Sequence, residues 1–170
     1  LSHKKQKLLI KNKPERVNLF IPKNEKEREF MIEAVKGMLL SKCAEIFSSF
    51  EEDREQGRFR KNEIPPKDAI VYYEVKTDPM KPCTNVQAWH LEKSNLTELD
   101  DPNYDQKLNP AKTKSMYYHQ ASFSIRIEPE ESRGYLSFTM GPLFGRGYMV
   151  DIKRTGDTPY LGEVQMQWIS

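Results

Sequence analysis

Apolar and polar residues alternate with a period of two through most of the last third of the chain, residues 116–169. In residues 117–128 the odd positions, apart from His119, carry apolar or aromatic side chains and the even positions are almost all polar. A strand shows this pattern when one face is buried and the other meets water. The pattern predicts four consecutive antiparallel strands. The three that follow the first are marked by Leu136/Phe138/Met140, Tyr148/Val150/Ile152 and Val164/Met166/Trp168.

A long amphipathic helix is predicted upstream of these strands, over roughly residues 25–52. Asn24 followed by Glu27 is a typical helix N-cap pattern. Apolar residues then recur at spacings of three and four, as on one face of a helix, at Ile32, Val35, Leu39, Cys43, Ile46 and Phe50. We expect this face to share one core with the strands, in which Val35, Leu39 and Ile46 pack against Phe123, Ile125, Phe138, Val150, Val164 and Trp168.

Two more strands are predicted between the helix and the four-strand segment, at residues 69–76 and 86–92, followed by a polar loop at residues 94–115. The expected fold class is α+β, with one long N-terminal amphipathic helix packed on a curved, mainly antiparallel sheet of about six strands. A cone-like or half-barrel sheet would suit this arrangement. We expect residues 1–23 to form a basic N-terminal arm with short apolar runs, and residues 24–170 to form a single α+β domain.

The charge balance directs attention to the N-terminal arm. The chain has 27 Lys and Arg against 25 Asp and Glu, so its net charge of +2 is too small to indicate a polyanion partner for the whole protein. The arm is a candidate attachment segment for a protein partner or for nucleic acid. We prefer a protein partner because the predicted strands add no further basic stripe. The basic residues of the arm are Lys4, Lys5, Lys7, Lys11, Lys13 and Arg16.

Residues 141–148 have the most unusual local composition in the chain. Glycines flank Arg146, and such glycines can adopt positive φ and let a backbone approach a ligand. The alternative is a wide hairpin loop whose Leu143 and Phe144 cover the end of the core. We take Leu143, Phe144, Arg146 and Tyr148 as candidate binding residues.

Two weaker patterns point to catalysis. Glu74-Val75-Lys76 has the spacing of metal-dependent nucleases, but strand alternation alone also produces an acid and a base two residues apart. His90 and His119 are candidates for acid–base chemistry, although His119 falls on an apolar strand face and is expected to be a core histidine. The acidic loop around Asp100 lacks the glycine and terminal glutamate of an EF-hand. We therefore expect no catalytic residues, no metal and no cofactor.

These observations favour a non-catalytic protein-interaction or assembly module, a domain or subunit of a larger complex or a homo-oligomer. A nucleic-acid-binding protein that uses the basic arm is the first alternative, and a metal-dependent nuclease or an enzyme with a cone-like fold is the second. Two cysteines without metal-binding spacing favour a reducing, intracellular compartment. No apolar stretch approaches the roughly 18 residues of a membrane span, so a soluble protein is expected.

Overall fold

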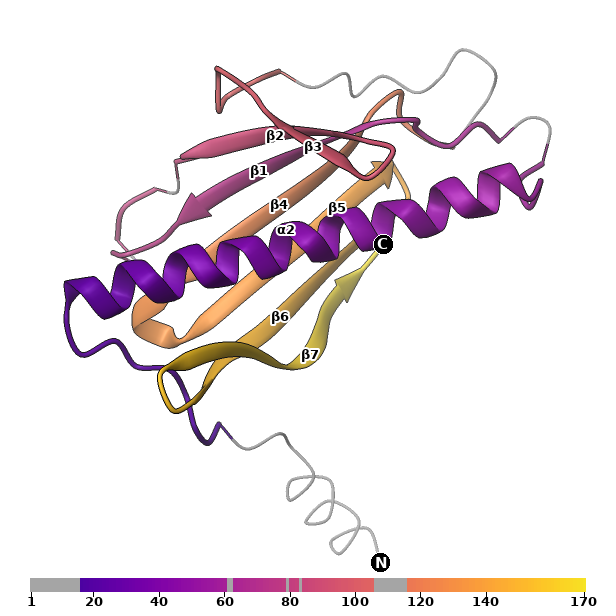
Figure 1. The fold of residues 1–170 in the computed structure, drawn as a ribbon. Helices are drawn as coiled ribbons and strands as arrows, with labels where there is room; N and C mark the ends of the chain where they lie inside the picture. Colours follow the sequence, from indigo (N-terminus) through magenta and orange to yellow (C-terminus); the bar gives the residue numbers. More distant parts are fainter. Residues whose placement is uncertain (1–15, 61–62, 79, 83, 106–115) are drawn as a thin grey trace, which may run out of the picture.

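One long helix lies across one face of a single twisted sheet (Figure 1). The computed structural model describes residues 16–60, 63–78, 80–82, 84–105 and 116–170. The helix, α2, covers Glu25–Glu55. The strands are β1 (Ala69–Val75), β2 (Gln87–Glu92), β3 (Asn95–Glu98), β4 (Ala121–Glu128), β5 (Arg133–Gly141), β6 (Phe144–Thr155) and β7 (Thr158–Ile169), with a short 3-10 turn, η1 (Pro129–Glu131), between β4 and β5.

The seven strands are arranged in the order β3-β2-β1-β4-β5-β6-β7. β4 to β7 form the antiparallel meander that the alternation predicts. β1, β2 and β3 form a second antiparallel unit. The two units join where β1 runs parallel to β4, with Ala69 opposite Ala121.

The α+β class and the mainly antiparallel sheet are confirmed, but the strand count is wrong, because the sheet has seven strands. The additional strand, β3, lies within the segment predicted to be a polar loop. It is too short for alternation to reveal, since only Leu96 interrupts its polar residues. The sheet is not closed and ends at β3 and β7, and the cone-like shape stays a prediction.

Helix α2 begins where the N-cap pattern predicts. The Asn24 side chain accepts a hydrogen bond from the Glu27 N–H at 2.8 Å, and Glu25 and Glu27 place negative charge in the first turn. The helix continues three residues beyond the predicted end, to Glu55. Its buried side chains are Met31, Ile32, Val35, Leu39, Cys43 and Phe47, which follow the predicted stripe closely.

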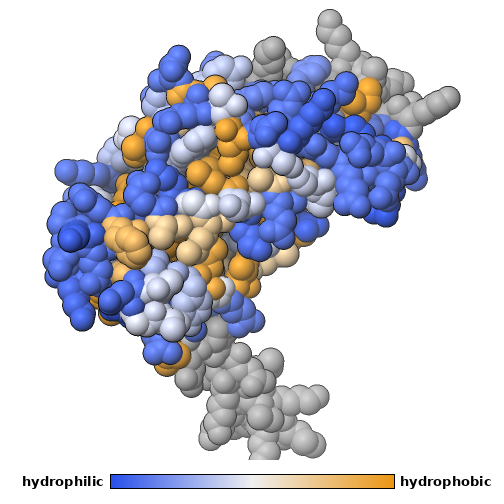
Figure 2. All heavy atoms as spheres, in the orientation of Figure 1, coloured by the Kyte–Doolittle hydropathy of each residue, from blue (hydrophilic) through white to orange (hydrophobic). Residues whose placement is uncertain are grey.

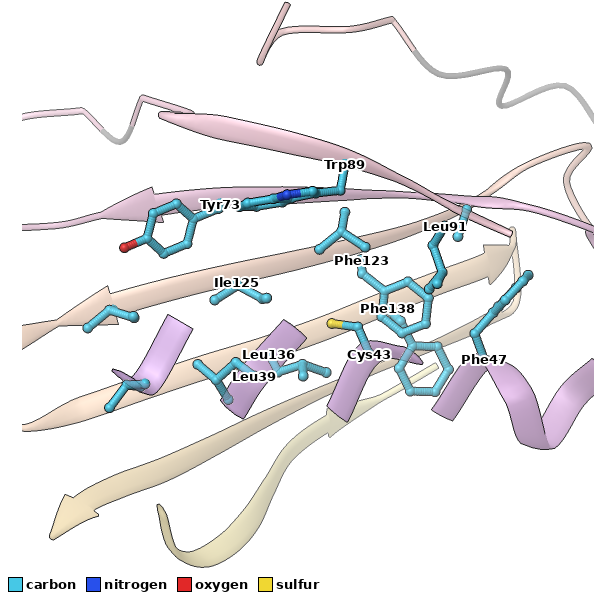
Figure 3. Close-up of a cluster of buried hydrophobic side chains, with 14 of the residues drawn as sticks. Leu39, Cys43, Phe47, Tyr73, Trp89, Leu91, Phe123, Ile125, Leu136 and Phe138 are labelled. Carbon is cyan, nitrogen blue, oxygen red and sulfur yellow. The ribbon is translucent and has the colours of Figure 1, made fainter. Parts of the chain in front are cut away.

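The core between α2 and the sheet contains a chain of aromatic rings (Figure 3). Phe47 of the helix meets Phe123 of β4 edge to face, with ring centroids 6.2 Å apart. Phe123 lies 5.6 Å from Phe138 of β5, and Phe138 stacks on Tyr148 of β6 at 6.4 Å. These rings connect the helix to three neighbouring strands, so one continuous core supports the centre of the fold.

Most of the predicted core is confirmed, and its last strand is not. Phe123, Ile125, Phe138 and Val150 are buried together with Val35 and Leu39, and Ile46 packs against them while partly buried. In contrast, Val164 is 52% exposed and Trp168 is 44% exposed. The alternation correctly predicted β7 as a strand, but it could not show that this strand lies at the edge of the sheet, where little covers it.

Removal of the Phe138 ring tests the aromatic chain. Phe138 contacts the rings of Phe50, Phe123, Phe144 and Tyr148, so Phe138→Ala should lower the free energy of unfolding by about 3–5 kcal/mol. Leu143→Ala is the control, since Leu143 is 82% exposed and the change should stay within about 0.5 kcal/mol. Urea unfolding measures both, and equal midpoints for Phe138→Ala and wild type would contradict this core.

Alkaline pH should weaken the same core. Burial, with a smaller contribution from the Glu33 carboxylate, raises the pKa of Tyr73 above its ordinary value of 10.0. Because the folded state holds this proton more tightly than the unfolded state, stability should fall as the pH rises above about 10, by up to about 1.4 kcal/mol per pH unit. Tyr73→Phe should reduce that slope in urea unfolding at a series of alkaline pH values. An unchanged slope would show that Tyr73 does not contribute.

Candidate docking surface

The last strand, β7, forms an edge of the sheet and is partly uncovered. Within the described residues, no strand pairs with its outer edge. Residues 164–169 of this strand carry no charged side chain. Val164, Met166, Trp168 and Ile169 are all exposed large hydrophobic residues. An edge strand of this kind presents unpaired backbone groups beside apolar side chains, which makes it a template for pairing with another chain.

The opposite edge of the sheet is built differently. β3 is only four residues long, and charged side chains lie in and around it at Glu92, Lys93, Glu98, Asp100 and Asp101. Short length and charge are the usual protections of an edge strand against unwanted pairing. The contrast between the two edges singles out β7 as the edge suited to docking.

A groove of about 420 Å³ runs between α2 and the β7 side of the sheet. Its floor and walls are mainly apolar and include Leu39, Ile46, Leu136, Tyr148, Val150 and Val164. In the space-filling view, apolar residues are visible between the hydrophilic outer surface of α2 and the part of the sheet formed by β6 and β7 (Figure 2). The groove therefore adjoins the uncovered edge strand.

The flank of α2 that lines the groove carries charged as well as apolar side chains. Lys42 and Glu45 lie on this flank, line the groove and form an exposed ion pair at 3.5 Å. An exposed pair of this kind contributes little to stability. Its main effect is to place one positive and one negative charge at the rim of an apolar groove.

The C-terminal part of β7 is held against β6 by a tryptophan packed on glycine. Trp168 lies opposite Gly147, and a Cβ atom at position 147 would collide with the indole ring. One register shift in β7 lies between Met166 and Trp168, because Tyr148 pairs with Met166 and Gly147 with Trp168. This bulge turns Trp168 to the sheet face opposite α2, while Val164 stays on the groove side.

The hairpin predicted as a binding loop is tighter than expected. β5 ends at Gly141 and β6 begins at Phe144, so only Pro142 and Leu143 form the turn. Gly145 and Gly147 do not have positive φ, so the backbone conformation considered for these glycines is wrong for both. Gly147 is required instead by the Trp168 ring.

The four candidate binding residues of this hairpin have different surroundings in the structure. Phe144 packs on Phe50 with ring centroids 5.7 Å apart, which agrees with a role in covering the end of the core. Tyr148 lines the groove. Leu143 is exposed, and the Arg146 guanidinium lies 6.0 Å from the Phe144 ring centroid. Only Tyr148 of this set belongs to the docking surface, and binding by the other three stays a prediction.

The basic arm is described only at its end. Lys4, Lys5, Lys7, Lys11 and Lys13 lie outside the described residues. Arg16 forms an ion pair with the buried Asp151 carboxylate at 3.2 Å and donates to the Glu131 carbonyl. Arg16 therefore has a structural role, because it neutralises the buried Asp151 carboxylate together with Arg133, whose Nε lies 3.6 Å from the same oxygen.

Two of the three histidines, His90 and His119, lie near Asp68 at the start of β1. His90 Nε2 lies 2.8 Å from Asp68 Oδ2, and the Gln120 side-chain amide donates to the same oxygen at 2.8 Å. The Asp68 carboxyl group therefore joins His90 of β2 to Gln120, which directly precedes β4. His119 is exposed, so the expectation of a core histidine is wrong. The start of β4 at Ala121 leaves this residue in the preceding connection.

The residues of the nuclease pattern lie at the C-terminal end of β1. Glu74 lies beside Arg126 across the parallel pair of strands, and both line a small hollow of about 150 Å³ on the sheet face opposite α2. Lys76 follows the end of β1. Among the described residues, no cluster of three or more His, Cys, Asp or Glu side chains is arranged to hold a metal ion.

Protein-family models, curated proteins and solved structures gave no match to this chain. The part of the chain that the structure describes contains no helix that is both long and apolar enough to span a membrane. The docking surface therefore depends on the geometry alone. A sequence signal for it existed in the uncharged residues 164–169, which the strand alternation led us to assign to the core.

The contact between Trp168 and Gly147 offers a test of how β7 is held. Gly147→Ala places a Cβ where the indole lies, so Trp168 should leave β6 and the protein should lose about 1–3 kcal/mol of stability. The indole N–H resonance of Trp168 should shift towards its position in the unfolded chain.

Gly37→Ala is the matched control, because a Cβ there meets nothing within 4 Å. It should instead stabilise α2 by up to about 1 kcal/mol. An unchanged Trp168 resonance in Gly147→Ala would show that the tryptophan is not held by this contact.

Proposed function

We propose that this protein is a non-catalytic interaction module that binds an extended, uncharged, apolar segment of a polypeptide along β7. One observation carries the proposal, namely that an uncharged and partly exposed edge strand adjoins an apolar groove of about 420 Å³. Neither feature alone would be specific. Together they provide the two kinds of contact that an added strand needs.

The binding mode follows from strand geometry. An extended segment laid beside β7 would pair its backbone N–H and C=O groups with the free edge, which supplies affinity without regard to sequence. Its alternate side chains would point to the α2 side and enter the groove beside Val164 and Tyr148. The groove would therefore select apolar residues at every second position.

The charges around the surface favour a segment of low net charge. Lys42 and Glu45 at the rim cancel each other, and residues 164–169 contribute none. A strongly acidic or basic partner would gain little electrostatic attraction here. These features support protein docking over nucleic-acid binding at this surface.

Selection from a random-peptide display library on the full chain tests the proposal. Peptides enriched on the wild-type protein should be extended and apolar, and Met166→Lys should weaken them about tenfold or more, because an ammonium group would be desolvated in the interface. Met116→Lys is the matched control, since Met116 is 53% exposed and Met166 is 54% exposed. The control should retain the wild-type affinity.

The location of binding provides a second measurement. Addition of a selected peptide should shift the backbone amide resonances of residues 164–169 and of Leu39, Lys42 and Ile46 on α2. Peptides that bind Met166→Lys as well as wild type, or that shift only the resonances of β3, would contradict the proposal. So would a selection that yields no peptide on a monomeric chain.

A further inference from the structure

We infer that the segment bound along β7 is the β7 strand of a second copy of this chain, so that two molecules pair antiparallel about a two-fold axis. The inference rests on the proposed function of β7 as a docking edge and names its partner. Two seven-stranded sheets would then form one continuous sheet. A two-fold contact uses the same surface on both copies, so this surface must be complementary to itself.

The edge strand meets this requirement. In an antiparallel pair of β7 strands with the axis at Gln165, Val164 of one copy lies opposite Met166 of the other. Both residues are on the α2 side in the β6–β7 register, opposite Val150 and Tyr148 respectively. Like charges directly opposite each other would destabilise such a pair, and the uncharged residues 164–169 avoid this.

In the same register, the charged residue of β7 nearest to the two-fold axis does not face a like charge. Glu163 of one copy lies opposite Gln167 of the other, so the two glutamates are not cross-strand neighbours. Val164 then faces Met166, Gln165 faces Gln165 of the other copy, and Gln167 faces Glu163. The exposed Val164 and Met166 would each be covered by a residue of the partner.

The rim of the groove is also self-complementary. A two-fold axis perpendicular to the sheet keeps both α2 helices on the same face and runs them in opposite directions. Lys42 of each copy therefore faces the side of the other copy that carries Glu45. The two grooves face each other above the paired strands, and opposite charges across them attract instead of repelling.

The assembly should stop at two copies. Pairing through β7 uses up the docking edge of both molecules, and the remaining edges are the short, charged β3 strands. An isologous contact closes on itself, in contrast to a head-to-tail contact that continues into a fibre. The structure thus points to a closed dimer.

Sedimentation equilibrium of the full chain over a range of concentrations tests the inference. The wild type should be a dimer that dissociates on dilution. Met166→Lys should raise the dissociation constant about tenfold or more, because two lysines would approach across the axis, whereas Met116→Lys should leave it unchanged. A wild type that is monomeric at every concentration, or a Met116→Lys variant that dissociates equally, would overturn the inference.

Charge pairs test the two-fold geometry itself. Residues 166 of the two copies are diagonal neighbours, about 7–8 Å apart, so a mixture of Met166→Lys and Met166→Glu should form mixed dimers more readily than either variant forms its own. At the rim, Lys42→Glu should weaken the dimer, and Lys42→Glu with Glu45→Lys should restore it. Random pairing in the mixture would contradict the antiparallel arrangement.

The outcomes separate this inference from the proposed function. If the chain is monomeric but selected peptides bind along β7, the second copy is not the partner and the docking function stands. If the chain dimerises and Met166→Lys has no effect, the contact lies elsewhere and the inference is wrong. If neither peptides nor a second copy bind at β7, both proposals fail.

Discussion

The fold depends on how one helix covers a sheet that is wider than itself. A helix with its side chains is about 10–12 Å across, whereas seven strands spaced about 4.8 Å apart span about 29 Å. The apolar stripe of α2, from Met31 to Phe47, can therefore seal only part of the sheet. The aromatic rings of Phe47, Phe123 and Phe138 show where it does so.

The parts of the sheet that α2 does not cover differ between its two edges. Towards β3 the sheet ends in a short strand among charged residues, which water can solvate. Towards β7 the strand is long and curves beside α2 (Figure 1). Its register shifts against β6 increase the local twist. The curve brings Leu161 and Val164 to the wall of the groove that faces Lys42 and Glu45 of α2.

The periodic sequence patterns predicted the type of most elements and which of their side chains share a face. The three- and four-residue spacing identified the buried face of α2, and the alternation identified the strands that became β4 to β7. These signals are local, since they depend on side chains that share a face. They carry no information on whether another element covers that face, so Val164 and Trp168 were assigned to the core although they are exposed. Trp168 was displaced further by a bulge, which interrupts the alternation by one residue.

The parallel contact between β1 and β4 has a kinetic consequence. Asp68 and Gln120, which are hydrogen-bonded where these strands begin, are separated by 52 residues in sequence, whereas the hairpin strands on either side are neighbours along the chain. Closing a loop of that length costs roughly 3.5 kcal/mol of chain entropy, and no contact repays it until both strands are aligned. Each antiparallel unit can form from residues that are close in sequence. We therefore expect the pairing of β1 with β4 to be the slow step in folding of the domain.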